Sequence, residues 1–278
     1  AHCHVGIIEE IFREGDDANE TTDPVTPHLR VIDGIAPGDL GFGDALAGGV
    51  TTLCITPGSA NVLGGEMAVV KTAGATIEEM LVRFPAGMKA ALGENPKRVY
   101  GREKRTPATR MASAALLRSA LVQAGEYLRK GEQGRRKPPD RDLKLEALAR
   151  VLKGEVPLRV HAHRADDILT ALRIAREFGV RLVIEHATEG HKIAGILARE
   201  GVPVVLGPII TSRPKPEMRA LDIAAAKTLA DAGVRFAIMT DHPVVPVQYL
   251  GLSAALTVRG GLDEERAAAL ILAARAEE

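Results

Sequence analysis

The sequence predicts an α/β protein, a (β/α)8 TIM barrel, and two observations support this fold class. Short apolar runs alternate along the chain with helical patterns, which is typical of parallel strands joined by helices. The length of 278 residues also suits one such barrel, because these barrels often contain about 250 residues. We therefore expect a single domain that covers residues 1–278.

Eight apolar runs, rich in β-branched residues and leucine, have the length of buried strands. They are Ala1–Gly6, Val50–Thr56, Glu66–Lys71, Gly87–Leu92, Leu158–His163, Arg181–His186, Val202–Leu206 and Val234–Thr240. Eight strands alternating with helices favour a closed barrel of parallel strands over an open sheet.

Helical patterns lie between several of these strands. They cover Ala112–Arg129, Leu143–Leu152, Asp166–Phe178, His191–Glu200, Ala220–Ala232 and Leu262–Glu277. Asp166 is the predicted N-cap of its helix, and a glycine ends three of the helices, two of them directly before the next strand. The longest connection, residues 93–157, is a helical insertion between the fourth and fifth strands. Its basic tract, residues 135–139, has the composition of a solvated loop.

The composition excludes several classes of protein. The chain has 36 basic and 36 acidic residues, so it lacks the positive charge expected of a nucleic-acid-binding protein. No apolar run reaches the roughly 18–20 residues of a membrane span, and the N-terminus does not resemble a signal peptide. The two cysteines fall inside predicted strands, which argues against a disulfide framework. We expect a cytoplasmic protein with a small-molecule partner and no nucleic-acid or membrane partner.

Metal-binding residue types lie in or just after four of the predicted strands. Side chains alternate along a strand, so the two members of a His-x-His pair point the same way. In a barrel, the carboxyl ends of the strands meet at one rim. Imidazole and carboxylate groups are ligands for Zn²⁺ and similar cations. The residues that would converge are His2 and His4, His161 and His163, His186, and Asp241.

These motifs resemble those of the amidohydrolase superfamily of metal-dependent hydrolases, especially its imidazolonepropionase-related and prolidase-related branch. The matching motifs are His2-x-His4, His161-Ala-His163, Glu185-His186 and Thr240-Asp241, in the expected order along the whole chain. The resemblance implies one or two divalent metals, Zn²⁺ with Mn²⁺ and Fe²⁺ as alternatives. Most members of this branch also carry a flanking β-sandwich. Because this sequence begins inside the first strand and ends after the last helix, we expect a barrel that lacks this β-sandwich. We also expect a homo-oligomer that forms through the barrel surface which the β-sandwich would otherwise cover.

The resemblance also assigns roles to individual residues. His2 and His4 would ligate the more buried metal, and His161 would be the ligand from the fifth strand. His186 would be the ligand from the sixth strand and part of the catalytic centre. Asp241 would serve as both a ligand and the general base.

Five further residues complete the predicted site. Lys89 is a candidate for the carboxylated lysine that bridges two metals in some members of the superfamily, and a salt-bridged or snorkelling lysine is the alternative. His163, Arg164, Asn61 and His242 are candidates for contacts with the substrate.

The expected reaction is metal-dependent hydrolysis of a carbon–nitrogen bond other than an ordinary protein peptide bond. The substrate would be a small amide, a cyclic amide or a dipeptide-like molecule, attacked by a metal-activated water with Asp241 as general base. One alternative is a deaminase of the same superfamily, which adds an acid on the fifth strand where this sequence has His163 and Arg164. Another is a catalytically inactive metal-binding barrel fragment.

Overall fold

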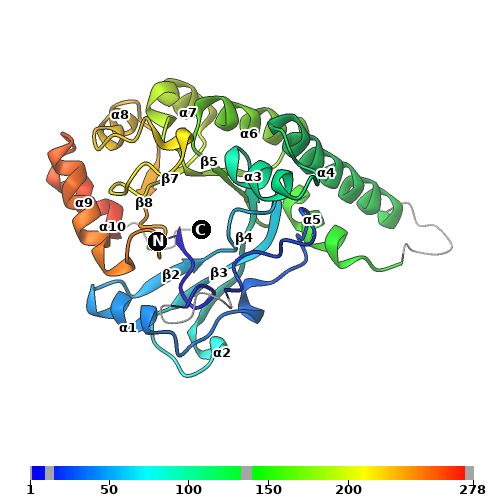
Figure 1. Ribbon diagram of the computed structural model, residues 1–278, viewed down its shortest axis with the longest axis horizontal. Coiled ribbons are helices and arrows are strands. Elements are labelled where there is room, and N and C mark those ends of the chain that lie inside the picture. Colours follow the sequence, from blue (N-terminus) through cyan, green and yellow to red (C-terminus); the bar gives the residue numbers. More distant parts are fainter. Residues whose placement is uncertain (1, 10–15, 133–139, 273–278) are drawn as a thin grey trace.

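The computed structural model describes residues 2–9, 16–132 and 140–272 (Figure 1). Eight strands form one sheet in the order β1 to β8, so the eight predicted strands are confirmed. They are β1 (His2–Cys3), β2 (Thr52–Ile55), β3 (Leu63–Lys71), β4 (Leu81–Ala91), β5 (Leu158–Ala162), β6 (Leu182–His186), β7 (Val204–Leu206) and β8 (Phe236–Ile238). Residue 1 of the predicted first strand, the basic tract 135–139 and the end of the last predicted helix lie outside the described residues.

The prediction that all the strands run parallel is wrong for β3. This strand is antiparallel to both of its neighbours, β2 and β4. The chain between β2 and β3 is short and has no helix, and a parallel crossover needs a dozen or more residues. Between β3 and β4 lies only the four-residue helix α2 (Ile77–Met80). The other neighbouring strands are parallel, as predicted.

The sheet curls, but the prediction of a closed barrel is also wrong. Within the part of the chain that the structure describes, no ladder joins β8 to β1. A backbone hydrogen bond from the His4 N–H to the His242 carbonyl, of 3.0 Å, links the two ends just beyond these strands. The ladder that holds β1 is short, with His2 opposite Cys54 and Cys3 opposite Ile55.

Helices lie around the outside of the curled sheet (Figure 1). They are α1 (Leu40–Ala47), α3 (Glu94–Arg102), α4 (Arg110–Glu132), α5 (Leu143–Leu152), α6 (Ala165–Phe178), α7 (Ala194–Glu200), α8 (Ala225–Asp231), α9 (Leu250–Arg259) and α10 (Glu264–Leu272). The predicted helices are confirmed in place, but His191 lies in the short 3-10 helix η3 (Gly190–Ile193) before α7, and α8 begins at Ala225 rather than at the predicted Ala220. The helices α1, α3 and α9 and the short α2 were not predicted from the sequence.

The predicted cap of α6 is corrected. Arg164 occupies the N-cap position, and Asp166 lies inside the first turn, where its carboxylate pairs with the Arg164 guanidinium. The predicted end is confirmed, because Gly179 adopts the left-handed conformation with φ 65°.

The core consists mainly of valine, leucine, isoleucine and alanine side chains from the strands and the inward faces of the helices. Cys3 and Cys54 are buried free thiols, as the sequence indicated. Among the described residues, no helix has the length and apolarity to cross a membrane. β4 enters this core at its carboxyl end, so Lys89 is fully buried.

Candidate metal centre

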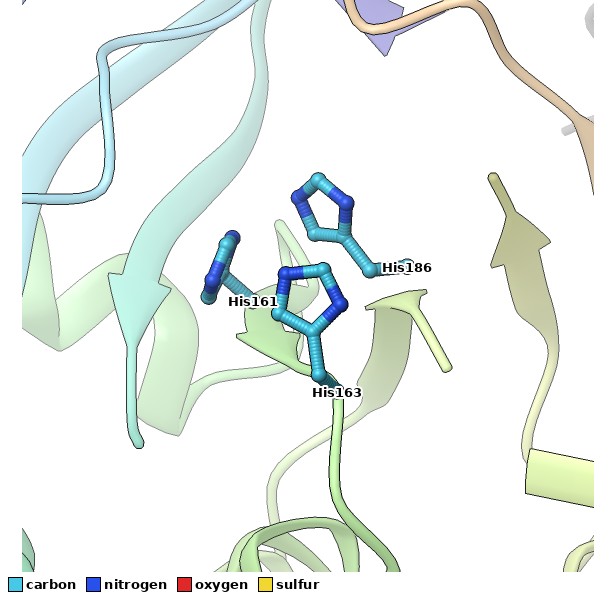
Figure 2. Close-up of side chains that lie close together, drawn as sticks. All are labelled: His161, His163 and His186. Carbon is cyan, nitrogen blue, oxygen red and sulfur yellow. The ribbon is translucent and has the colours of Figure 1, made fainter. Parts of the chain in front are cut away.

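Two groups of buried side chains gather at the carboxyl ends of the strands. Within each group, the potential ligand atoms lie within 4.8 Å of one another. The first group consists of His2, His4 and Asp241, from β1 and the chain after β8. The second group, which we call the three-histidine group, consists of His161, His163 and His186 (Figure 2).

The two groups are close neighbours. The His186 ring lies 4.1 Å from the His161 ring and 4.6 Å from the His163 ring, measured between centroids. The His2 ring lies 5.6 Å from the same His186 ring. The first strand therefore shares one centre with the fifth and sixth strands, as the motifs predicted.

In each of the five imidazoles, the Nδ1 atom makes a hydrogen bond to another group of the protein. The partners are Glu185 Oε2 for His2 (2.8 Å), the Thr56 carbonyl for His4 (2.7 Å), Ser59 Oγ for His161 (2.9 Å), Thr188 Oγ1 for His163 (2.7 Å) and the Gly207 carbonyl for His186 (3.0 Å). A carbonyl or carboxylate only accepts, so Nδ1 of His2, His4 and His186 donates. In a neutral imidazole this leaves the lone pair on Nε2, and such outer contacts orient metal ligands.

Several atoms that face the centre have no hydrogen-bond partner among the described residues. They include His2 Nε2, His163 Nε2 and Asp241 Oδ1. His2 Nε2 and His4 Nε2 each lie 3.4 Å from Asp241 Oδ1. A buried polar atom without a partner costs free energy, so a convergent set of them needs a ligand.

The protonation states suit a cation. Burial is the main reason why the pKa values of His161 and His163 lie well below the usual histidine value. Burial opposes ionisation of Asp241, but His186, His2 and His4 outweigh it and keep the pKa of Asp241 well below its usual value. Neutral imidazoles beside an ionised carboxylate form the donor set that a divalent cation such as Zn²⁺ takes, so the residues present fit a metal.

Lys89 approaches the same centre from β4. Its side chain is fully buried, and its Nζ has no hydrogen-bond partner among the described residues. Burial lowers the pKa of Lys89 to about 8, partly opposed by the carboxylates of Glu185 and Asp241. The amine is therefore less protonated than an ordinary lysine at the same pH.

The backbone is strained where two of these side chains enter the centre. His186 has a φ of 72° and Asp241 has a φ of 55°, in the left-handed region that side chains other than glycine rarely adopt. Such conformations cost about 1–3 kcal/mol each and are concentrated at functional sites. At the end of β6, this turn lets His186 join the centre beside its neighbour Glu185.

The structure brings one of the four predicted substrate residues, His163, into this centre. The Asn61 amide nitrogen donates to Thr26 Oγ1 and to two backbone carbonyls of the loop at residues 20–23. Arg164 is half-exposed and pairs with Asp166. His242 is buried, and its Nδ1 accepts a hydrogen bond from the Val247 N–H. The geometry gives no support for a substrate contact by these last three residues.

Sequence reasoning missed the residues that hold the imidazoles. The sequence indicates Glu185 only as part of a motif, yet its other oxygen accepts a hydrogen bond from Arg159 Nε. Arg159 occupies the inward-facing register two residues before His161, which could have indicated a buried partner for Glu185. Ser59 and Thr188 lie in loops, and their sequence carries no signal of this role.

The chain is similar to known amidohydrolases. It superposes on the crystal structure of an amidohydrolase from Thermotoga maritima MSB8 with a TM-score of 0.95 and 46% identity, over 98% of this chain and 72% of that one. It is 32% identical to the amidohydrolase tasK of Hapsidospora irregularis over 99% of its own length. It spans only 31% of the length of that relative. No protein-family model matches the chain. Its identity to the Thermotoga protein over most of both chains shows that this chain belongs to the amidohydrolase family.

Proposed function

We propose that the protein is a metal-dependent hydrolase that cleaves a carbon–nitrogen bond of a small amide, cyclic amide or dipeptide-like molecule. The main support is that buried nitrogen and oxygen atoms without hydrogen-bond partners among the described residues converge on one centre. The nitrogen atoms belong to imidazoles whose Nδ1 makes a hydrogen bond to another group of the protein. The residues that would hold the cation, with Zn²⁺ as the first choice, are His2, His4, His161, His186 and Asp241. Family membership supports the hydrolase activity.

A divalent cation supplies Lewis acidity when bound, which makes water a stronger acid and a carbonyl carbon more electrophilic. The chain supplies the proton transfer. The Asp241 carboxylate is ionised, and its Oδ1 has no hydrogen-bond partner among the described residues. It can accept a proton from the attacking water and deliver it to the leaving nitrogen. The backbone at Asp241 is in the left-handed region, a conformation that is concentrated at functional sites.

Two cations suit the arrangement better than one. His2, His4 and Asp241 form one complete group, and His161, His163 and His186 form another. Lys89 is buried without a partner near Asp241, which supports its role as a carboxylated bridge between the two groups. We therefore include His163 among the ligands of the second cation, in addition to its predicted role toward the substrate.

The contacts of the two acids that directly follow the fifth strand do not favour the alternative of a deaminase. That alternative needs a free acid close to the fifth strand, and Asp166 and Asp167 follow it most closely. Asp166 pairs with Arg164, and Asp167 accepts two hydrogen bonds from Arg110 Nε, both of 3.0 Å. Both carboxylates are therefore engaged away from the three-histidine group.

Asp241→Asn tests the proposal. Metal content is measured after purification without chelator in the presence of Zn²⁺ or Mn²⁺, and turnover is measured with N-acyl amino acids, dipeptides and cyclic amides. We expect the variant to keep most of its metal and to lose about 10²–10⁴-fold in kcat/KM. Asp231→Asn is the matched control, because Asp231 pairs with Lys227 on the surface of α8.

Each outcome has a defined meaning. A wild-type protein that holds no metal contradicts the proposal outright. A protein that holds metal but turns over none of the substrates is an inactive metal-binding barrel. Equal turnover by Asp241→Asn and Asp231→Asn excludes Asp241 as the general base.

A further inference from the structure

The loop after β7 places two charged side chains beside the three-histidine group. Glu217 lies in the 3-10 helix η4 (Pro216–Met218), and its side chain is 1% exposed. Its Oε1 lies 3.8 Å from His163 Nε2. Lys215 Nζ lies 3.6 Å from the same oxygen. These two contacts connect the Lys215 ammonium to the centre.

The start of α3 holds the Glu217 carboxylate in place on the side away from the centre. Its Oε2 accepts a hydrogen bond of 3.0 Å from the Glu94 N–H at the start of α3. The preceding residue is Gly93, with a φ of 87°, and a Cβ there would lie 2.9 Å from Glu217 Oε2. The glycine therefore leaves the space that this carboxylate occupies. Glu217 Oε1 has no hydrogen-bond partner among the described residues and faces the centre.

The Lys215 ammonium has N–H donors that make no hydrogen bond among the described residues. Its side chain is 17% exposed, so it lies nearer to the solvent than the buried Glu217. Its distance of 3.6 Å to Glu217 exceeds the usual 2.7–3.2 Å of a hydrogen bond. Across residues 2–9, 16–132 and 140–272, Lys215 makes no other polar contact. Glu217 Oε1 lies between the two groups, 3.6 Å from Lys215 Nζ and 3.8 Å from His163 Nε2, so this ammonium is close to the centre.

Cations on neighbouring loops are already paired at short range. Arg164 donates to Asp166, at 2.6 Å for the shorter contact, and Lys192 donates to Glu189 at 2.6 Å. The long contact of Lys215 therefore distinguishes it from these two cations, because its ammonium can accept a further anion without breaking a hydrogen bond.

We propose that Lys215 binds a carboxylate of the substrate and that Glu217 is a positioning residue that holds the Lys215 ammonium beside the three-histidine group. This inference rests on the proposed function and adds a substrate class to it: small amides with a free carboxylate a few bonds from the scissile bond. A singly charged carboxylate fits better than a phosphate, because the carboxylates of Glu94 and Asp167 lie near Glu217 and, with it, repel a second negative charge.

The test compares matched substrates in the metal-loaded protein. Dipeptides and N-acyl amino acids are each paired with the carboxamide that lacks the charge. We expect the wild-type protein to prefer the carboxylate, and Lys215→Met to lose about 10- to 100-fold in kcat/KM for that member alone, through KM. Lys215→Arg keeps most of the preference, and Glu217→Gln weakens it. Lys227→Met on the surface of α8 is the matched control.

The outcomes separate this inference from the proposed function. Amide hydrolysis without a carboxylate preference overturns the role of Lys215 and leaves the proposed function intact. A carboxylate preference that persists in Lys215→Met also overturns the role of Lys215 and leaves the proposed function intact. A stronger preference for phosphate-bearing amides has the same meaning. A metal-loaded wild-type protein that hydrolyses no member of any pair overturns the proposed function, and this inference with it.

Discussion

Replacing Lys89 by methionine removes a buried amine whose ammonium has no hydrogen-bond partner among the described residues. In the folded protein, burial lowers the pKa of Lys89 from 10.5 to about 8. Because the unfolded chain holds this proton more tightly, the protonated amine opposes folding at neutral pH. A pKa difference of this size corresponds to about 3 kcal/mol. We therefore expect Lys89→Met to raise the free energy of unfolding of the metal-free protein by up to about 3 kcal/mol.

The pH dependence supplies a second signature. Between the folded and unfolded pKa values of Lys89, the unfolded chain binds more protons, so wild-type stability rises as the pH increases through about 8 toward 10.5. The methionine variant lacks this contribution. Urea denaturation of chelator-treated protein, followed by circular dichroism near pH 7 and near pH 9, measures both effects.

Lys71→Met is the matched control, because Lys71 is exposed at the end of β3 and donates to Thr52 Oγ1. Its effect is expected within about 0.5 kcal/mol. A clear fall in unfolding free energy for Lys89→Met would show that Lys89 stabilises the fold as an ion-pair partner of Glu185 or Asp241. That result refutes the reasoning from burial.

Two other predictions concern the buried charges around the centre. Arg159→Met leaves the fully buried Glu185 without its guanidinium partner, so the free energy of unfolding falls by about 3–5 kcal/mol. Arg118→Met breaks an exposed pair with Glu177 and costs far less free energy than Arg159→Met; equal losses in urea denaturation contradict this ranking. The pKa of Asp241 is lowered on folding, so its contribution to stability is present above the unfolded value of about 4 and is lost as the pH falls below it. Acid titration of the metal-free protein should show a smaller loss for Asp241→Asn than for the wild type.

The order of the strands could be predicted because hydrophobic runs and glycine-terminated helices are local signals. The direction of β3 has a signal too, in the length of its connection to β2. The sequence places the start of this strand at Glu66, because glycines at positions 64 and 65 are poor strand formers. The observed strand begins at Leu63, and Gly65 has a φ of 126°. Either start leaves a connection below the dozen or so residues that a parallel crossover needs, so the alternation of strands and helices misled the prediction of a parallel strand here.

The candidate site was predictable only where regular strand geometry places it. His161 and His163 lie two residues apart and both reach the three-histidine group, as strand alternation requires. Glu185 and His186 are consecutive and should face opposite ways, yet Glu185 contacts His2 and His186 also enters the centre. The left-handed backbone at His186 lets both side chains point toward the centre. This conformation could not be predicted, because a histidine, unlike a glycine, does not indicate a positive φ.

The loop residues could not be found by the same reasoning. Glu217 is held beside His163 by a contact to the start of α3, far away in the sequence, and Lys215 pairs with Glu217. Hydrophobic periodicity describes the elements that carry a loop and not the course of the loop itself.

The candidate metal ligands lie far apart along the chain, and this separation has a consequence for protein synthesis. The three-histidine group comes from β5 and β6, which are adjacent in the sequence and in the sheet. The other group joins His2 and His4 to Asp241, which leaves the ribosome much later. The group of His2, His4 and Asp241 therefore cannot be complete until β8 and Asp241 have emerged from the ribosome. Cation binding by arrested nascent chains of increasing length measures this order, and equal binding before and after residue 241 emerges contradicts it.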